Sequence, residues 1–297
     1  MNSSKDNSTP AWWLRALGRV PLPVMYALAG AMAFLMRDVL RYRVAVARAN
    51  LAAALPMLDA DSRRRILRRH YDSLASVLFE LPRLASMSAE ELQARMTLPD
   101  MPGVREELAR GTPVLVLAAH QGNWEWLLQA LALGFGAPFL AAYKPPHSEA
   151  ADRLMLGVRE RFGTRMVPGK RLLREVLRRR GTAHAIGMVA DQVPTSSPGR
   201  VWLEFFGRET AFFPGPAEIA KAGRYSVYFL ALRRLRRGYY ETRFEPIAAA
   251  GEDLDVPTLI RRYAARVEAL VREHPEDWAW THRRWKLEPP AKTAPAN

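Results

Sequence analysis

The 297-residue chain contains no cysteine, which excludes disulfides, thiolate metal ligands and a cysteine nucleophile. It also lacks the Gly-x-Ser-x-Gly elbow of serine hydrolases, the Gly-x4-Gly-Lys-Ser/Thr phosphate loop and the Gly-x-Gly-x-x-Gly dinucleotide fingerprint. The six histidines are scattered, and no two have the spacing of metal ligands. We therefore expect no metal and no cofactor, and chemistry that ordinary side chains carry out.

Acidic residues are in short supply. The chain has 44 lysines and arginines against 30 aspartates and glutamates, a formal net charge of +14. Such an excess indicates an anionic partner. Nucleic acid, an acidic membrane surface, a phosphorylated substrate and an acidic carrier protein all satisfy this condition, so charge alone does not choose among them.

One long uncharged run lies near the N-terminus. Residues 1–10 are polar, and we expect them to be disordered; residues 20–36 then carry no charge at all. Seventeen residues are at the short limit for a membrane span. Trp12, Trp13 and several arginines flank the run as interfacial anchors do. We favour a membrane-associated helix near residues 20–40, of undecided orientation; a buried core helix is the alternative.

The rest of the chain divides at about residue 110. Residues 11–110 have mostly helical periodicity, whereas short apolar runs alternate with helical segments afterwards. The expected strands are 114–119, 138–143, 183–190, 226–232 and 239–244, and the expected helices are 124–133, 148–162, 170–180, 216–222 and 257–273. This alternation predicts an α/β core over residues 111–288, a mixed, mostly parallel sheet flanked by helices. Residues 289–297 are expected to form a disordered tail.

The strand predicted at 114–119 leads directly into the most informative stretch. His120 follows the strand, at the edge where open α/β sheets place reactive groups. Glu125 comes five residues later and reaches His120 only across a turn, for which Gly122 and Asn123 are suitable. The arrangement fits a general base, His120, with Glu125 as the carboxylate that orients it. A loop histidine beside an acidic first helical turn is the alternative interpretation.

The string His120-Gln121-Gly122-Asn123-Trp124-Glu125 resembles the His-x4-Asp/Glu motif of the glycerolipid acyltransferase superfamily. Its form is closest to the late acyltransferases of lipid A biosynthesis, which add lauroyl or myristoyl chains. The similarity continues in order along residues 12 to 288, in these further segments: Arg48-Ala49-Asn50-Leu51, Tyr143-Lys144-Pro145, Arg159 to Gly163, Asp191-Gln192, Phe206 to Pro216, and His274 to Lys286.

The resemblance implies a fold like that of glycerol-3-phosphate acyltransferases and a catalytic pair of His120 and Glu125. By the same resemblance, Arg159, Arg161 and Lys144 are expected to bind the oxyanion or the headgroup. At position 144 the family has arginine, and lysine keeps the charge but cannot form arginine's bidentate hydrogen bonds. The remaining site candidates that it implies are Gly122, Asn123, Trp124, Asp191 and Gln192. For Asp191, a simple strand-ending turn is the alternative.

The resemblance also implies substrates and a location. The acyl donor would be acyl carrier protein, and the acceptor a hydroxyl of a Kdo-bearing lipid A precursor. The catalytic domain would lie at the cytoplasmic side of the inner membrane, with a membrane surface and no nucleic acid as partner. Another lysolipid or glycolipid acceptor stays open, as does a non-catalytic basic protein that binds membranes or nucleic acid. Should residues 121–125 form regular helix, His120 would need another carboxylate, and Asp191 is the first to consider.

Overall fold

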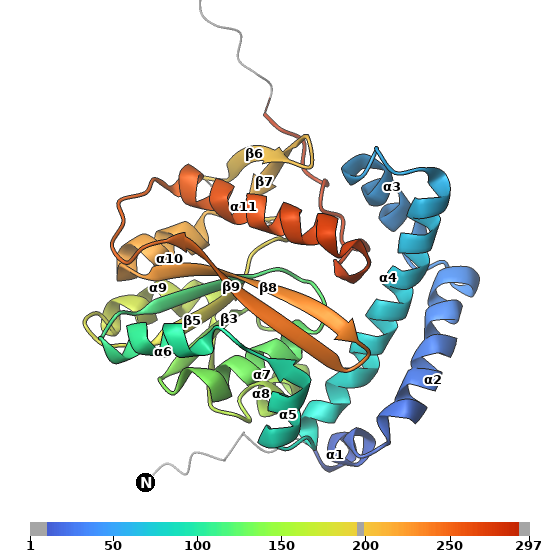
Figure 1. Ribbon diagram of the computed structural model, residues 1–297, viewed down its shortest axis with the longest axis horizontal. Helices are drawn as coiled ribbons and strands as arrows, with labels where there is room; N and C mark the ends of the chain where they lie inside the picture. The colour runs from blue at the N-terminus through green and yellow to red at the C-terminus, as the bar shows by residue number, and fades with distance from the viewer. Residues whose placement is uncertain (1–10, 195–198, 291–297) are drawn as a thin grey trace, which may run out of the picture.

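The computed structural model describes residues 11–194 and 199–290, so the predicted disordered segments 1–10 and most of 289–297 lie outside the described residues. Seven strands form one sheet in the order β1-β9-β8-β2-β5-β3-β4 (Figure 1). Their bounds are β1 (Met96–Thr97), β2 (Val114–Ala118), β3 (Phe139–Tyr143), β4 (Thr164–Pro168), β5 (Ala185–Val189), β8 (Ser226–Arg236) and β9 (Tyr239–Ala248). Neighbouring strands are parallel except for the antiparallel hairpin of β8 and β9. The predicted mostly parallel α/β sheet is confirmed.

Helices cover both faces of this sheet, as the continuous apolar runs of its central strands require. One face packs against α5 (Ala89–Arg95), α6 (Met101–Ala109) and α7 (Trp124–Phe135). The other packs against α9 (Gly169–Arg178), α10 (Gly215–Gly223) and α11 (Val256–Glu273). Alternate residues of β2 serve the two cores: Val114 and Val116 face α7, and Leu115 and Leu117 face α11. The helix α8 (Glu149–Arg159) links β3 to β4.

The N-terminal helices form a layer beside the sheet. These are α1 (Trp12–Gly18), α2 (Leu22–Phe34), the π-helical turn η1 (Leu35–Val39), α3 (Val44–Ala54) and α4 (Ala60–Glu80), followed by the short 3-10 helix η2 (Leu81–Ala85). The long helix α4 begins at the capping residue Asp59, whose side chain accepts a hydrogen bond from the Ser62 amide. It contacts α2 along one side and, near the C-terminus of the chain, the short 3-10 helix η3 (Pro275–Asp277) on the other (Figure 1).

Several elements differ from the expectation. β1 lies inside the region expected to be helical and pairs with β9 at the sheet edge. β4 falls where no strand was predicted, because Arg165 interrupts its apolar pattern at the opposite edge. The segment after Asp191 contains a two-stranded antiparallel sheet of β6 (Val201–Phe205) and β7 (Arg208–Phe212), where no strand was predicted.

Candidate active site

The site begins at the carboxyl end of β2. All five residues of this strand are buried, and it lies between β5 and β8 in the middle of the sheet. His120 comes two residues after the last strand residue, Ala118, and its side chain is 21% exposed. The strand therefore carries the imidazole to the edge of the sheet and leaves part of the ring accessible, as the sequence predicted.

A tight turn separates His120 from the helix that follows. Gly122 has a φ of +55°, the left-handed region that glycine adopts most readily, and its amide donates to the Asp277 carbonyl at 3.0 Å. Asn123 then caps α7, since its side-chain oxygen accepts a hydrogen bond from the Trp126 amide at 2.9 Å. Trp124 is the first residue of α7, and its ring stands edge-on to the His120 ring at 5.3 Å between centroids.

The carboxylate that holds His120 is Asp191. His120 Nδ1 lies 2.6 Å from Asp191 Oδ1, and the His120 amide donates to Asp191 Oδ2 at 3.0 Å. Asp191 follows β5, the strand that runs parallel to β2 and pairs with it residue by residue. Two adjacent parallel strands thus deliver the acid and the base to one edge of the sheet. Because Nδ1 is bound, the other ring nitrogen, Nε2, lies on the side of the ring away from Asp191.

The surroundings of Asp191 favour its ionised form. Its residue is only 2% exposed, and its Oδ2 accepts a third hydrogen bond from the Trp278 indole nitrogen at 2.8 Å. Burial by itself would raise the pKa of this carboxyl, but attraction to His120 and the hydrogen bonds from His120 and Trp278 lower it below its ordinary value. A buried carboxylate beside Nδ1 fixes the ring orientation and favours the tautomer with its proton on Nδ1.

The predicted contact between His120 and Glu125 is wrong. Glu125 is the second residue of α7 and forms a bidentate ion pair with Arg159, the last residue of α8; Arg159 Nε donates to Glu125 Oε2 at 2.8 Å, and Arg159 Nη2 donates to Oε1. α7 begins at Trp124, so the chain is already helical at Glu125 and turns its carboxylate toward α8. Both side chains are mostly buried, with 13% and 18% exposure.

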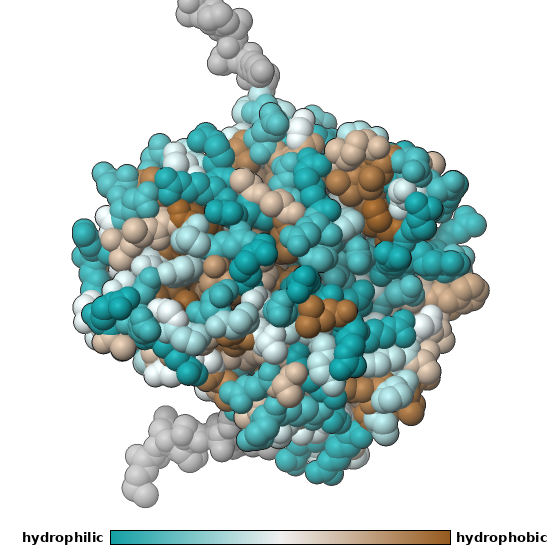
Figure 2. Space-filling model, in the orientation of Figure 1, coloured by the Kyte–Doolittle hydropathy of each residue, from teal (hydrophilic) through white to brown (hydrophobic). Residues whose placement is uncertain are grey.

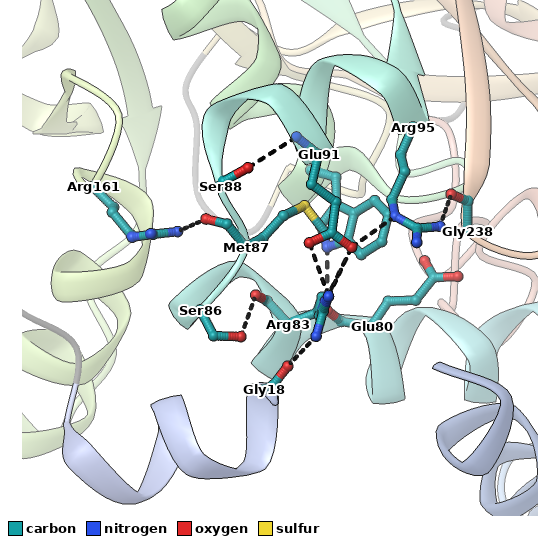
Figure 3. Close-up of polar contacts among 11 residues, drawn as sticks. Gly18, Glu80, Arg83, Ser86, Met87, Ser88, Glu91, Arg95, Arg161 and Gly238 are labelled. Carbon is teal, nitrogen blue, oxygen red and sulfur yellow. Dashed lines mark hydrogen bonds and ion pairs between the residues drawn. The ribbon is translucent and has the colours of Figure 1, made fainter. Parts of the chain in front are cut away.

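Of the other predicted cations, neither Arg161 nor Lys144 points into the site. Arg161 donates to the main-chain carbonyl of Met87 (Figure 3) and to that of Leu84, and its guanidinium stacks on Phe162. Its side chain is engaged with main-chain carbonyls near η2 and does not line the cavity beside His120, because two residues after Arg159 the chain has left α8. Lys144 is exposed at the end of β3, and Gln192 is exposed beside Asp191.

An apolar cavity of ≈190 Å³ opens beside His120. It lies between α7 and the sheet, and His120, Trp124, Glu125 and Arg159 line it together with apolar residues. These include Val116, Ala118, Leu127, Leu128, Leu131, Phe139, Ala141 and Gly187. The volume is several times the ~30 Å³ of a water molecule, so the cavity accommodates part of an alkyl chain. Its wall on α7 runs from Trp124 to Leu131, about 10 Å at 1.5 Å per residue.

Small residues of the sheet create this cavity. Gly187 on β5 is paired with Val116 on one side and with Ala141 on the other, so little side chain fills the middle of the sheet under α7. The Phe139 ring lies across Gly187, since a Cβ built on that glycine would come within 2.9 Å of it. Leu131, about two turns along α7 from Trp124, and Phe139, at the start of β3, line the end of the cavity away from His120. Within residues 11–194 and 199–290, no group of three potential metal ligands comes together.

Two residues that support the site were not recognised as functional from the sequence. Trp278, in the C-terminal segment that resembles the family, was given no role of its own, yet its indole nitrogen donates to Asp191. Glu80, at the end of α4, is fully buried and accepts hydrogen bonds from Asn123 Nδ2 and the Tyr240 hydroxyl, both at 2.7 Å. A lone glutamate at the end of an amphipathic helix offers no local signal of such a role. Its position becomes meaningful only once α4 is packed beside the turn at residues 121–123.

Comparison with known proteins shows the family of the chain. Residues 9–287 match the family model of the bacterial lipid A biosynthesis acyltransferases. The chain belongs to this family. It is 25% identical to a lipid A biosynthesis lauroyltransferase of Escherichia coli, over 94% of each chain. It is also 22% identical to a lipid A biosynthesis palmitoleoyltransferase of the same organism, over 96% of this chain and 95% of the relative. A lipid A biosynthesis acyltransferase of Haemophilus influenzae is 22% identical, over 91% and 84%.

In this lipid A acyltransferase, two of the segments that resemble the family meet in space. Asn50, from the early Arg-x-Asn-Leu segment, donates through Nδ2 to the carbonyls of Trp280 and His282, both at 2.8 Å. Arg284, in the same C-terminal segment, is 2% exposed and packs over the Phe212 ring. The C-terminal segment thus closes over the far side of Asp191 and is part of the architecture of the site.

Proposed function

We propose that the protein transfers a fatty acyl chain from the thioester of acyl carrier protein to a hydroxyl of a lipid A precursor, with His120 as general base. The observation that carries this proposal is the 2.6 Å contact between His120 Nδ1 and buried Asp191, at the mouth of an apolar cavity. Asp191 takes the orienting role that the sequence assigned to Glu125.

The reaction follows from this arrangement. An acceptor hydroxyl beside His120 Nε2 gives up its proton as its oxygen attacks the thioester carbon, and Asp191 stabilises the imidazolium that forms. When the carbon–sulfur bond breaks, the imidazolium returns that proton to the departing thiolate. The products are an ester and a free thiol, so protons and charge balance without any other reactant.

Arg159 is suited to stabilising the negative oxygen of the intermediate. Of the three predicted cations it alone lines the cavity, and its Nη1 takes no part in the bidentate pair with Glu125. Glu125 fixes the guanidinium in place, which reduces the reorganisation needed when charge develops. In this proposal Glu125 acts on Arg159, and Asp191 acts on His120.

The cavity is suited to the acyl chain. Apolar residues make up most of its lining, with Phe139 and Leu131 at the end away from His120. An alkyl chain in this cavity would have its thioester at the open end, beside His120. The disaccharide acceptor and the carrier protein would stay outside, where the net charge of +14 favours their acidic groups. We place the enzyme at the cytoplasmic side of the inner membrane, where such a lipid acceptor is embedded.

The test is acyl transfer from labelled acyl carrier protein to purified lipid A precursors. We expect the wild-type protein to form an acylated lipid and His120→Ala to lose the activity. Lys221→Ala is the control, because Lys221 is exposed on α10 and does not line the cavity. If the protein acylates another lysolipid but no lipid A precursor, that lysolipid replaces the lipid A precursor as the proposed acceptor. Undiminished transfer by folded His120→Ala would reject the proposed base.

A further inference from the structure

The helix α2 contacts the globular domain along its whole inner face. Leu22, Met25, Ala29 and Ala33 recur every three or four residues, are at most 8% exposed and pack toward α4. Small residues at positions 29 and 33 allow the two helices to approach closely. The α2 helix is therefore an integral layer of the structure, and α4 occupies the side that lipid or other chains would otherwise contact.

The opposite face of α2 is exposed and apolar. Val24, Leu28, Phe34 and Leu35 are 49%, 52%, 58% and 38% exposed, and residues 20–36 contain no charge. Val24, Leu28 and Leu35 project within about 40° of one another at 100° per residue. A surface helix of a water-soluble protein carries polar side chains on that face. Figure 2 shows apolar residues at the edge of the molecule where α2 lies.

Apolar exposure continues beyond both ends of α2. Trp12, Trp13 and Leu17 on α1 are 77%, 46% and 45% exposed, and Val39 and Leu40 after α2 are 59% and 64% exposed. We call these residues, with Val24, Leu28, Phe34 and Leu35, the apolar strip. Exposed arginines flank it at both ends: Arg15, Arg19, Arg41 and Arg43.

Both ends of the strip are fastened to the same domain. At the first, Arg83 Nη1 donates to the Gly18 carbonyl at 2.9 Å (Figure 3), and a Cβ on Gly18 would lie 2.3 Å from the Pro82 carbonyl oxygen. At the second, the Tyr71 hydroxyl of α4 donates to the Tyr42 carbonyl. A segment held at both ends by one domain has both ends on one side of a membrane.

A polar link between these ends also resists separation of α2. The Tyr26 hydroxyl donates to Glu80 Oε1 at 2.9 Å, and Glu80 Oε2 accepts from Asn123, the cap of α7. Lifting α2 away to cross a bilayer would break this contact and expose the buried faces of both helices. The link also sets the distance between the strip and the catalytic turn.

We propose that α2 lies in the plane of an anionic phospholipid membrane, its apolar strip in the headgroup and acyl boundary, and does not cross the bilayer. By length and composition the segment Leu22–Val39 is able to span, but the fastened ends and the occupied inner face oppose it. The flanking arginines select the anionic surface. This inference rests on the proposed lipid acceptor, since a strip parallel to the bilayer holds His120 at constant height above it.

Single labels measure the depth of the strip directly. Because the chain has no cysteine, Leu17→Cys, Leu28→Cys and Val39→Cys each give one site for an environment-sensitive fluorophore. The full-length proteins are bound to vesicles of phosphatidylethanolamine and phosphatidylglycerol that contain lipids brominated at defined depths. We expect all three labels to be quenched best by shallow bromines, at equal depth. Leu173→Cys, 48% exposed on α9, is the control and should not be quenched.

A deep label at 28 between shallow labels at 17 and 39 would overturn the proposal, because that profile belongs to a spanning helix. Labels 17 and 39 reached by an impermeant thiol reagent from opposite sides of inner-membrane vesicles would overturn it as well.

A binding measurement tests the lipid specificity. We expect Leu28→Asn to weaken sedimentation with the anionic vesicles about tenfold or more, and the matched Leu173→Asn to leave it unchanged. Equal binding to purely zwitterionic vesicles would contradict the proposed preference for an anionic membrane surface. Acyl transfer in detergent is measured in parallel with both variants. Retained transfer with lost vesicle binding supports the membrane role, whereas absent transfer in the wild type would refute the proposed function and leave the depth result standing.

Discussion

Asp191 and His120 face each other because β5 and β2 are parallel neighbours. Ala118, at the end of β2, is in register with Val189, at the end of β5, so the two polar residues that follow the strands emerge side by side. The acid is 71 residues away in sequence, and the contact is made by the sheet rather than by the turn after His120.

Replacing Asp191 by asparagine tests this contact. We expect Asp191→Asn to lower kcat about 10²- to 10⁴-fold, because the amide no longer stabilises the imidazolium or selects the ring tautomer. Single-turnover acyl transfer across pH separates the effect from product release. A variant that folds and retains the wild-type rate and pH profile would show that His120 does not depend on Asp191.

Glu125 is expected to behave differently. Glu125→Gln and Arg159→Gln should each slow transfer, since each leaves its partner mostly buried without its counter-charge. The double variant should lose less than the sum of the two, with a coupling of about 0.5–3 kcal/mol. The pH profile of acyl transfer should persist in Glu125→Gln. Additive losses in the cycle would contradict the ion pair as the functional unit.

The apolar lining of the cavity gives a prediction about donor length. Ala141→Leu should disfavour long acyl chains, because the larger side chain occupies space in the middle of the cavity. Each methylene left unburied costs about 0.8 kcal/mol, roughly a fourfold loss in kcat/KM. Competition among acyl carrier proteins loaded with different chains provides the measurement, and the short donors serve as internal control. An unchanged length profile would place the acyl chain elsewhere.

Glu80 should make stability depend on pH. Burial raises the pKa of this carboxyl, although hydrogen bonds from Tyr240, Asn123 and Tyr26 oppose the increase. The folded pKa exceeds the unfolded one near 4.5, so wild-type stability relative to Glu80→Gln is highest below that value and falls as pH rises through the folded pKa. Each tenfold difference between the folded and unfolded acid dissociation constants lowers the free energy of unfolding by about 1.4 kcal/mol once the carboxyl is ionised. Urea unfolding of both proteins from pH 4 to pH 8 measures this loss.

A second substitution separates charge from hydrogen bonding at this position. Glu80→Ala leaves the amide of Asn123 and the hydroxyls of Tyr240 and Tyr26 without their acceptor, and we expect it to lose about 2–3 kcal/mol or more at every pH. A pH-independent difference between wild type and Glu80→Gln would show that the carboxyl does not titrate with a raised pKa.

Much of the sheet was predictable because its strands are short apolar runs ended by polar residues. The position of His120 after the central strand, and of Asp191 after another, followed from that pattern. Local pattern carries no information on which strands become neighbours, however, so Asp191 was considered as the partner of His120 only in second place, after Glu125. Glu125 was chosen as the partner of His120 because it is near in sequence. In the structure α7 already begins at Trp124, and the helix turns the Glu125 carboxylate away from His120 toward α8.

The arginines show the same limit. Arg159 and Arg161 are two residues apart in one motif, yet Arg159 is the final residue of α8 and faces the cavity, whereas Arg161 binds carbonyls on the other side. Helix ends are the least certain part of any sequence-based assignment, and here one helix end decides which cation is available. The uncharged run at 20–36 was recognised as a membrane segment candidate, but its angle to the membrane depends on contacts with α4 that no local pattern contains.

Trp278 is synthesised after the other residues of the site. The ribosome makes every strand of the sheet, and both His120 and Asp191, before it adds the indole that hydrogen-bonds to Asp191. The Asn50 contacts to residues 280 and 282 also wait for this last segment. A growing polypeptide therefore emerges with its apolar strip early, while the hydrogen bonds around His120 and Asp191 are completed late. With the membrane contact and the mechanism proposed above, the order of synthesis would delay acyl transfer until the protein lies on its lipid surface.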